Sequence, residues 1–166
     1  MKIEIRKPKL SDAKEYWQIF NDKNVIKELT GFPHPCPLSR IEKELKNNLK
    51  DWQTGKGYSF IILADGEIAG SIILENPSKD NGRYDIGFFI GRKFWGRGIA
   101  TEAIKQTVKF AFQKLNLYRI QGDNDSDNPA SGRAMEKAGF KFEGVRKKYC
   151  KKKGKFVDLH LWGITR

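Results

Sequence analysis

The chain has 166 residues, 39% of them hydrophobic, and a formal net charge of +12 at pH 7. This length fits one domain, 1–166, able to bury a hydrophobic core without disulfides or metals. The two cysteines, Cys36 and Cys150, match neither a disulfide framework nor a zinc site, and no metal is expected. The N-terminus is charged and no apolar run could span a membrane, so a soluble, cytoplasmic protein without membrane association is expected.

The first elements follow from periodicity and capping residues. Isoleucines alternate with charged residues over 2–6, which predicts a half-buried strand, and Ser11 is expected to cap the first helix. Ser39 and Glu42 have the spacing of a capping box, so a second helix is expected to begin there. Gly55 is expected to end it.

The middle of the chain reads as strands. Residues 58–63 and 68–74 are β-rich runs separated by Asp65-Gly66, a typical hairpin signal, so they are expected to pair antiparallel. Residues 84–90 form the next apolar strand. We therefore expect this part of the chain to form the centre of a sheet.

The remaining chain is expected to add two helices and three strands. They are an amphipathic helix over 99–115, a strand over 117–121, a helix opened by Asn128 and closed by Gly139, and strands over 141–149 and 156–164 joined at Lys153-Gly154. The fold class is α+β, a mixed α/β pattern with a mostly antiparallel sheet of about seven strands flanked by about four helices.

One segment has the composition of an anion-binding loop. The strand ending at Ile90 runs into a basic loop with Gly96 and Gly98, and a helix follows. Glycines let the backbone approach a ligand, and the first amides of the helix point outward at the positive end of its dipole. Such a site suits a pyrophosphate, with Arg92, Lys93 and Arg97 as further donors. Two other phosphate-binding motifs do not fit this segment. The Gly-Lys-Ser/Thr ending of a Walker A loop is absent, and the dinucleotide-binding motif GxGxxG would need a glycine where Thr101 stands.

Together with a second block, this segment resembles the GNAT acetyltransferase superfamily, and within it the ribosomal-protein N-terminal acetyltransferase (Rim-type) branch. The resemblance spans almost the whole chain. The coenzyme A motif of the family falls on Lys93-Phe-Trp-Gly96-Arg-Gly98, with lysine as a departure in the first place. The second motif falls on Asn128-Pro-Ala-Ser131 and Gly139-Phe140.

The resemblance implies an N-acetyltransferase that uses acetyl-CoA as cosubstrate, without a metal. It places pantetheine on the backbone of the fourth strand and on Asn128, and the phosphates on the loop, on the following helix and on the basic residues after Asn128. The cofactor residues expected in this way are Phe88, Phe89, Ile90, Lys93, Trp95, Gly96, Arg97, Gly98, Ile99, Ala100, Thr101, Asn128, Ser131, Arg133 and Lys137.

Transfer to an amine needs a base for the ammonium proton and an acid for the departing thiolate. The resemblance suggests a carboxylate on the fourth strand, and Asp85 is the nearest acid; a water relay, Glu28 or Glu102 stay alternatives. Many relatives donate the thiolate proton from a tyrosine, but Met135 occupies that place. Ser131 is the substitute we expect, although a serine bonded to the helix backbone is the alternative.

The loop 29–38 and the net charge bear on the acetyl acceptor but do not identify it. The resemblance makes the loop 29–38 a candidate wall of the acceptor site, so Phe32 and His34 are expected substrate contacts. His34 and His160 lack the partners of a metal site. The acceptor is an amine of a peptide, of a ribosomal-protein N-terminus or of a small molecule. A basic protein disfavours polyamines at long range, although an acidic pocket would reverse this.

Other functions compete with catalysis. The run Arg146–Lys155 interleaves basic residues with an aromatic, as nucleic-acid-binding surfaces do, so a binding module or docking of the enzyme on ribosomal RNA is an alternative. An acetyl-CoA sensor without transferase activity is another. The chain is expected to be a monomer or a homodimer, with the ribosome as a possible partner.

Overall fold

The computed structural model describes residues 1–29, 31–152 and 154–166. The turn expected at Lys153-Gly154 and the loop expected over 29–38 therefore each include a residue, Lys153 and Thr30, that lies outside the described residues. The helices are α1 Ala13–Phe20, α2 Lys23–Ile26, α3 Leu38–Thr54, α4 Ile99–Lys114 and α5 Pro129–Lys137. The strands are β1 Ile3–Arg6, β2 Tyr58–Ala64, β3 Glu67–Ser78, β4 Arg83–Ile90, β5 Arg119–Asp125, β6 Lys141–Lys152 and β7 Lys155–Thr165.

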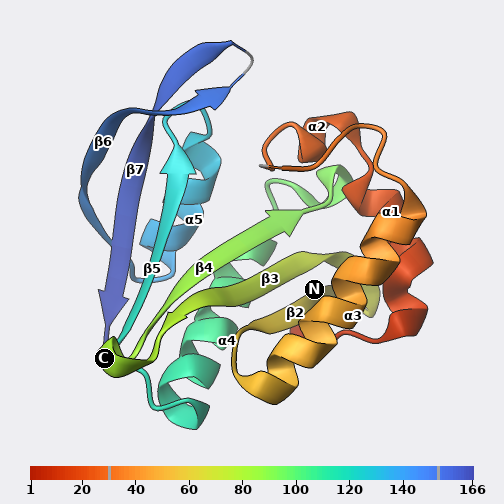
Figure 1. Ribbon diagram of the computed structural model, residues 1–166, viewed down its shortest axis with the longest axis horizontal. Coiled ribbons are helices and arrows are strands. Elements are labelled where there is room, and N and C mark those ends of the chain that lie inside the picture. The colour runs from red at the N-terminus through yellow and green to blue at the C-terminus, as the bar shows by residue number, and fades with distance from the viewer. Residues whose placement is uncertain (30, 153) are drawn as a thin grey trace.

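These strands form one sheet in the order β1-β2-β3-β4-β5-β7-β6, with helices on both faces (Figure 1). Among the described residues, only the β4–β5 pair is parallel, so the expected mostly antiparallel sheet of seven strands is confirmed. The β2–β3 turn was also correctly predicted, because Asp65 and Gly66 both adopt positive φ (49° and 85°), as a tight hairpin turn requires. The short helix α2 had no signal in the sequence.

The central strands β4 and β5 pair only at their beginnings. Their ladder runs from Arg83 opposite Arg119 to Asp85 opposite Gln121 and then stops. Beyond this point the strands diverge, and Figure 1 shows β4 and β5 leaving a common end in different directions. Polar backbone and side chains in the diverging halves are therefore available to a ligand.

Alternation along the strands creates two cores on opposite faces of the sheet. Phe60 and Ile62 of β2 pack with α4 and α5, whereas Ile61 between them packs with α1 and α3. The same alternation along β4 directs Ile86 toward α4 and Phe89 toward α1. We call these the α4 face and the α1 face. Among the described residues, no helix has the length and apolarity needed to cross a membrane.

The structure corrects three local predictions. Ser11 does not cap the first helix, because it lies within the 3-10 turn Leu10–Asp12 and the N-cap of α1 is Asp12. The expected capping box is absent, because Pro37 in an extended conformation (φ −68°, ψ 142°) precedes the helix and places Ser39 inside its first turn. The strand expected over 117–121 lies instead over 119–125. Its second half was missed because residues that face a cleft are polar and lack the apolar pattern.

Candidate active site

The glycine loop leads directly into the N-terminus of α4. Gly96 and Gly98 have φ of 74° and 75°, a conformation that other residues adopt only with strain. Gly98 is the N-cap and brings no side chain to the first amides of the helix. A Cβ at either glycine would meet nothing within 4 Å, so the space in front of these amides is open to a ligand. The anion site expected from the sequence therefore has a suitable geometry.

The start of α5 is fixed by a buried polar network. Asn124, 5% exposed, donates to the carbonyl oxygens of Asp125 and Asn128 at 2.8 and 3.1 Å. Its own oxygen accepts from Nε1 of Trp162 at 2.7 Å. Asn128 is the N-cap, but its side chain makes no capping bond and instead donates to Ser131 Oγ at 3.2 Å. The amide oxygen of Asn128 is thus not used by the helix.

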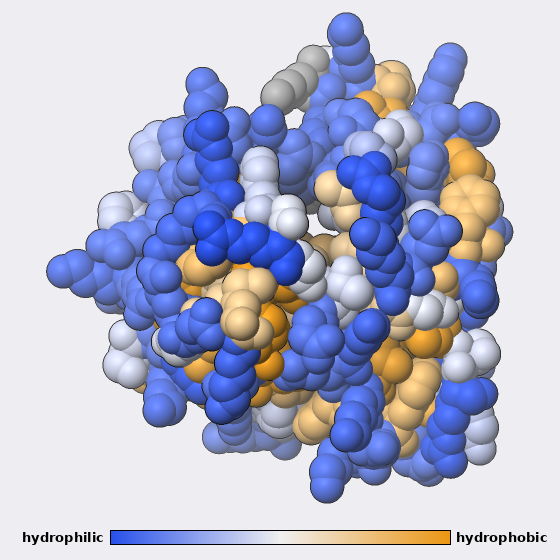
Figure 2. Space-filling view, turned by 180° about the vertical axis from the view of Figure 1, so that it is seen from behind, coloured by the Kyte–Doolittle hydropathy of each residue, from blue (hydrophilic) through white to orange (hydrophobic). Residues whose placement is uncertain are grey.

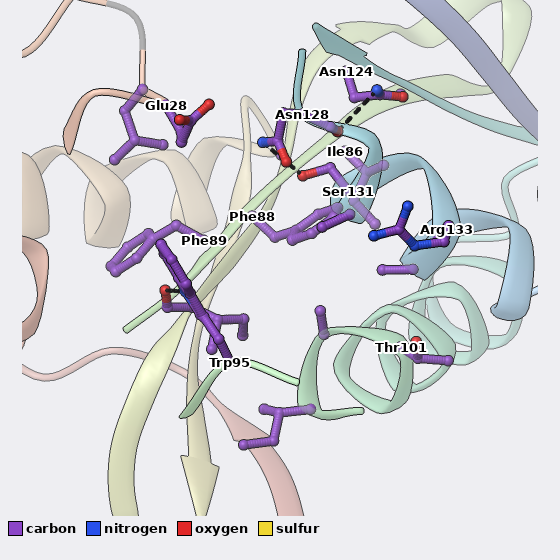
Figure 3. Close-up of a pocket in the computed structure, with 18 of the residues that line it drawn as sticks. Glu28, Ile86, Phe88, Phe89, Trp95, Thr101, Asn124, Asn128, Ser131 and Arg133 are labelled. Carbon is purple, nitrogen blue, oxygen red and sulfur yellow. Dashed lines mark hydrogen bonds between the residues drawn. The ribbon is translucent and has the colours of Figure 1, made fainter. Parts of the chain in front are cut away.

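A cleft of about 720 Å³ lies between the diverging strands and connects these two helix starts. Figure 3 shows Arg133 and Thr101 on one side of the cleft and Glu28 across from them. Figure 2 shows a hollow near the middle of the opposite face of the molecule from the one seen in Figure 1. The expected cofactor residues that line the cleft are Phe88, Phe89, Ile90, Trp95, Gly96, Arg97, Gly98, Ile99, Ala100, Thr101, Asn128, Ser131, Arg133 and Lys137.

Three expected site residues do not line the cleft. Lys93 points away, since its ammonium group pairs with Glu67 and lies 4.8 Å from the ring centroid of Phe94. Phe32 packs edge-on against Phe20, with centroids 4.9 Å apart, in the core of the α1 face. His34 is exposed. The structure therefore gives neither Phe32 nor His34 a contact with the cleft.

Comparison with known proteins decides the family. Residues 2–141 match the family described as Acetyltransferase (GNAT) domain. The chain belongs to the GNAT acetyltransferases. The enzyme class and the acetyl-CoA cosubstrate expected from the sequence follow from this membership.

Individual relatives agree over nearly the whole chain. The "Uncharacterized N-acetyltransferase p20" of Bacillus licheniformis is 28% identical over 166 residues, covering 99% of this chain and 93% of that protein. The crystal structure of the microcin C7 self-immunity acetyltransferase MccE with acetyl-CoA and AMP has a TM-score of 0.90 at 24% identity, covering 99% and 93%. The ribosomal L7/L12 alpha-N-protein acetyltransferase RimL, in complex with coenzyme A, gives 0.90 at 19%, covering 99% and 94%. The expected similarity to Rim-type proteins is confirmed.

Charge is unevenly distributed along the cleft of this GNAT domain. The anion site and the cations Arg97, Arg133 and Lys137 belong to the loop before α4 and to α5. Side chains alternate between the two faces of a strand, so Asp85 lies on the same face as Phe89, the α1 face. Glu75, which is paired with Asp85, lies on that face too. The cleft therefore has a positive end on one face and a negative end on the other.

The negative end is formed by three neighbouring strands. Glu75 of β3 is directly opposite Asp85 of β4, and Asp123 of β5 also lines this part of the cleft. The Glu75 carboxylate lies over Gly87, where a Cβ would be 3.5 Å from Oε1. Desolvation, together with the charge of Asp85, raises the pKa of both Glu75 and Asp123. These two carboxylates accept protons more readily than ordinary acids.

Asp85, the base expected from the sequence, lines the cleft but has both carboxylate oxygens engaged. Gln121 Nε2 donates to Oδ1 at 2.8 Å, and Asn76 Nδ2 donates to Oδ2 at 3.2 Å. Within the described residues, Glu75 and Asp123 have no hydrogen bond or ion pair through their carboxylates. The two groups better placed to take a proton are thus the ones that sequence reasoning missed.

The residue expected to replace the tyrosine of relatives is well placed. Ser131 lines the cleft, and its hydroxyl accepts from Asn128, so its proton is free to point elsewhere. Met135 is 1% exposed and lies in the core, with its sulfur against Gly122. Met135 therefore contributes packing to this GNAT domain and does not line the cleft.

A salt-bridge cluster joins two distant segments beside the negative end. Lys152 of β6 pairs with Glu28, Asp125 and Asp127 at 2.6, 3.1 and 3.1 Å, and its side chain is 14% exposed. Desolvation opposes the charge of Lys152, but the three carboxylates outweigh it and raise its pKa. Glu28 and Asp125 line the cleft, so this cluster holds the β6–β7 hairpin against the segment after α2. The ammonium group occupies a carboxylate trio of the kind that could otherwise hold a cation.

Proposed function

We propose that this enzyme transfers the acetyl group of acetyl-CoA to a primary amine on an acceptor that carries a second positive charge. The observation that supports this most strongly is a pair of carboxylates at the negative end of the cleft, Glu75 and Asp123, which form no hydrogen bond or ion pair with another described residue. A protein of net charge +12 repels cationic acceptors at long range, so a local acidic pocket is needed to hold them.

Acetyl-CoA supplies the acetyl group as a thioester. In the proposed complex its phosphates lie on the amides of Gly98–Thr101 and on Arg97 and Arg133, and its pantetheine arm lies along Phe88–Ile90 and Asn128. The outward amides of α4, the open space at the glycines and the cationic side chains support this assignment. Lys93 is not included, because its ammonium group pairs with Glu67.

We assign the general base to Glu75 rather than to Asp85. The Glu75 carboxylate lies over Gly87, next to the stretch proposed for pantetheine, so an acceptor ammonium there lies within its reach. Glu75 takes the ammonium proton, and the nitrogen lone pair then forms a bond to the carbonyl carbon. The nitrogen loses a second proton to solvent as the bond from carbonyl carbon to sulfur breaks, which leaves the amide. Ser131 donates its proton to the departing sulfur and regains one from solvent. Asp123 holds the second positive charge of the acceptor.

Matched acceptors test the proposal. The enzyme is incubated with acetyl-CoA and either a diamine or a monoamine of the same chain length, and with peptides whose second residue is Lys, Ala or Glu. Release of free thiol measures turnover. The diamine and the Lys peptide are expected to react with kcat/KM at least about tenfold above their matched partners, as one hydrogen-bonded ion pair to a partly desolvated carboxylate allows.

The outcomes separate the parts of the proposal. Equal rates for charged and neutral partners would contradict the acceptor class while leaving the transferase reaction intact. Preference for the peptide over the diamine would assign the acceptor to a protein N-terminus, and the reverse preference to a small polyamine. An acetyl-CoA-dependent rise in melting temperature without thiol release from any amine would support a sensor instead.

A further inference from the structure

The β6–β7 hairpin carries an exposed aromatic and basic surface that catalysis does not use. Cys150 and Lys152 face the cleft, because they contact Asp125 and Glu28. Neighbouring residues of a strand point to opposite sides, so Tyr149 and Lys151 lie on the outer side. Register places Phe156 of β7 opposite Lys151 and therefore on the same side.

Both outer rings are exposed and each has a cation beside it. Tyr149 is 59% exposed and Phe156 62%. The guanidinium carbon of Arg146 lies 5.0 Å from the Tyr149 centroid, and Nζ of Lys151 lies 5.9 Å from the Phe156 centroid. We call Arg146, Tyr149, Lys151 and Phe156 the hairpin patch. Its position at the sheet edge leaves it accessible, since β6 is the last strand.

The cations of the hairpin patch form no direct ion pair. Lys147 pairs with Asp158, and Lys152 pairs with the acidic trio. In contrast, the side chains of Arg146 and Lys151 form no ion pair with any described residue, although Arg146 lies near enough to Asp123 to counteract part of the rise in the pKa of that carboxyl. Two cations, each beside an exposed ring, give the patch both charge and flat stacking surfaces.

We propose that the hairpin patch binds single-stranded RNA. Unpaired bases stack on exposed aromatic rings, while lysine and arginine contact the phosphates. Duplex RNA hides its base faces, so it does not use the rings. A membrane anchor would need a larger apolar area than two rings surrounded by charge provide. The proposal goes beyond the acetyl transfer reaction and does not depend on its acceptor.

Fluorescence anisotropy of a labelled, unstructured RNA of about 12 nucleotides tests the proposal with the full chain. With about two phosphate contacts, log K is expected to fall with log salt at a slope of about −1.4. Tyr149→Ala and Phe156→Ala should each weaken binding at least about fivefold with little change in slope. Arg146→Ala/Lys151→Ala should remove nearly all of this slope.

Lys46→Ala/Lys50→Ala on exposed positions of α3 is the matched control, because it removes the same charge elsewhere. This control is expected to leave RNA binding within about twofold, as distant charges are screened at physiological salt. Equal losses in the Arg146/Lys151 and Lys46/Lys50 variants, equal affinity for a duplex of the same length, or binding to anionic lipid vesicles but not to RNA would each overturn the proposal. Thiol release with a small amine, measured in the same variants, confirms that they are folded.

Discussion

Glu75 combines an unpartnered carboxylate, a position over Gly87 and a raised pKa, so its substitution tests the base directly. Glu75→Gln keeps the shape and removes the proton acceptor. We expect kcat to fall by about 10²–10⁴-fold, with the acidic limb of the kcat/KM profile lost. Asp85→Asn is the comparison, and an equal or larger loss of kcat there would return the base to Asp85.

The same substitution should stabilise the fold. A carboxylate whose pKa is raised by folding stabilises the protein only at low pH, and this contribution is lost as pH rises through the folded pKa. Glu75→Gln should therefore increase the melting temperature more at pH 8 than at pH 4. The gain should stay below about 1 kcal/mol, because part of the side chain is open to solvent. A decrease at pH 8 would mean that Glu75 has a stabilising partner.

Substitution of Ser131 tests its proposed role as the acid that protonates the departing sulfur. If its hydroxyl protonates the sulfur, Ser131→Ala should reduce kcat by about tenfold or more while KM for acetyl-CoA changes little. Ser131→Thr keeps a hydroxyl and should retain part of the activity. Turnover of Ser131→Ala within about twofold of the parent enzyme at saturating acetyl-CoA would remove Ser131 from the mechanism.

Local signals explain which site residues were predictable. Gly96, Gly98 and Asn128 were predicted because a glycine loop or the residue before a helix can be recognised from a few neighbouring residues in the sequence. Glu75 and Asp123 were missed, since their proximity depends on the strand order and on the register that sets Glu75 opposite Asp85. Lys152 and Glu28 are 124 residues apart, and no pattern in the sequence joins them.

At the level of elements, alternation and turn chemistry predicted most strands, and helix periodicity predicted the long helices. The failures have physical causes. The second half of β5 is polar because it lines the cleft, and α2 has only four residues, too few for a periodic pattern. The divergence of β4 and β5, which creates the site, involves two strands far apart in the sequence and has no local pattern that could predict it.

The Lys152 cluster connects two elements, so its loss should affect both. Lys152→Met removes the ammonium group and leaves Glu28, Asp125 and Asp127 close together without a counter-charge. We expect a loss of about 1.5–3 kcal/mol in urea unfolding at pH 7. The deficit should shrink as pH falls toward about 4, because protonation relieves the repulsion.

Lys147→Met provides the matched control, since Lys147 lies on the same strand and pairs with Asp158 but is 78% exposed. Its loss should be below about 0.5 kcal/mol. Similar losses for both variants, or a Lys152→Met deficit that does not change with pH, would show that the cluster does not hold the hairpin.

At the scale of the whole molecule, the arrangement of charge matters more than its sum. The net charge of +12 attracts acetyl-CoA in general terms, but the cleft separates a cationic end from an acidic one. If the position of the charges determines the affinity for acetyl-CoA, removing two cations at the cleft should weaken binding far more than removing two cations elsewhere. Arg133 and Lys137 on α5, four residues apart, have the same spacing as Lys46 and Lys50 on α3.

Arg133→Met/Lys137→Met should weaken acetyl-CoA binding at least about tenfold by calorimetry at about 0.15 M salt, because charge-assisted contacts to phosphate are lost. Lys46→Met/Lys50→Met changes the net charge equally and should alter the Kd by less than about twofold. The parent enzyme should gain about 2.7 kcal/mol of stability at a hundredfold excess over Kd, and the α5 variant much less at the same concentration. Equal effects of the two pairs would mean that the overall field, and not the positive end of the cleft, holds the phosphates.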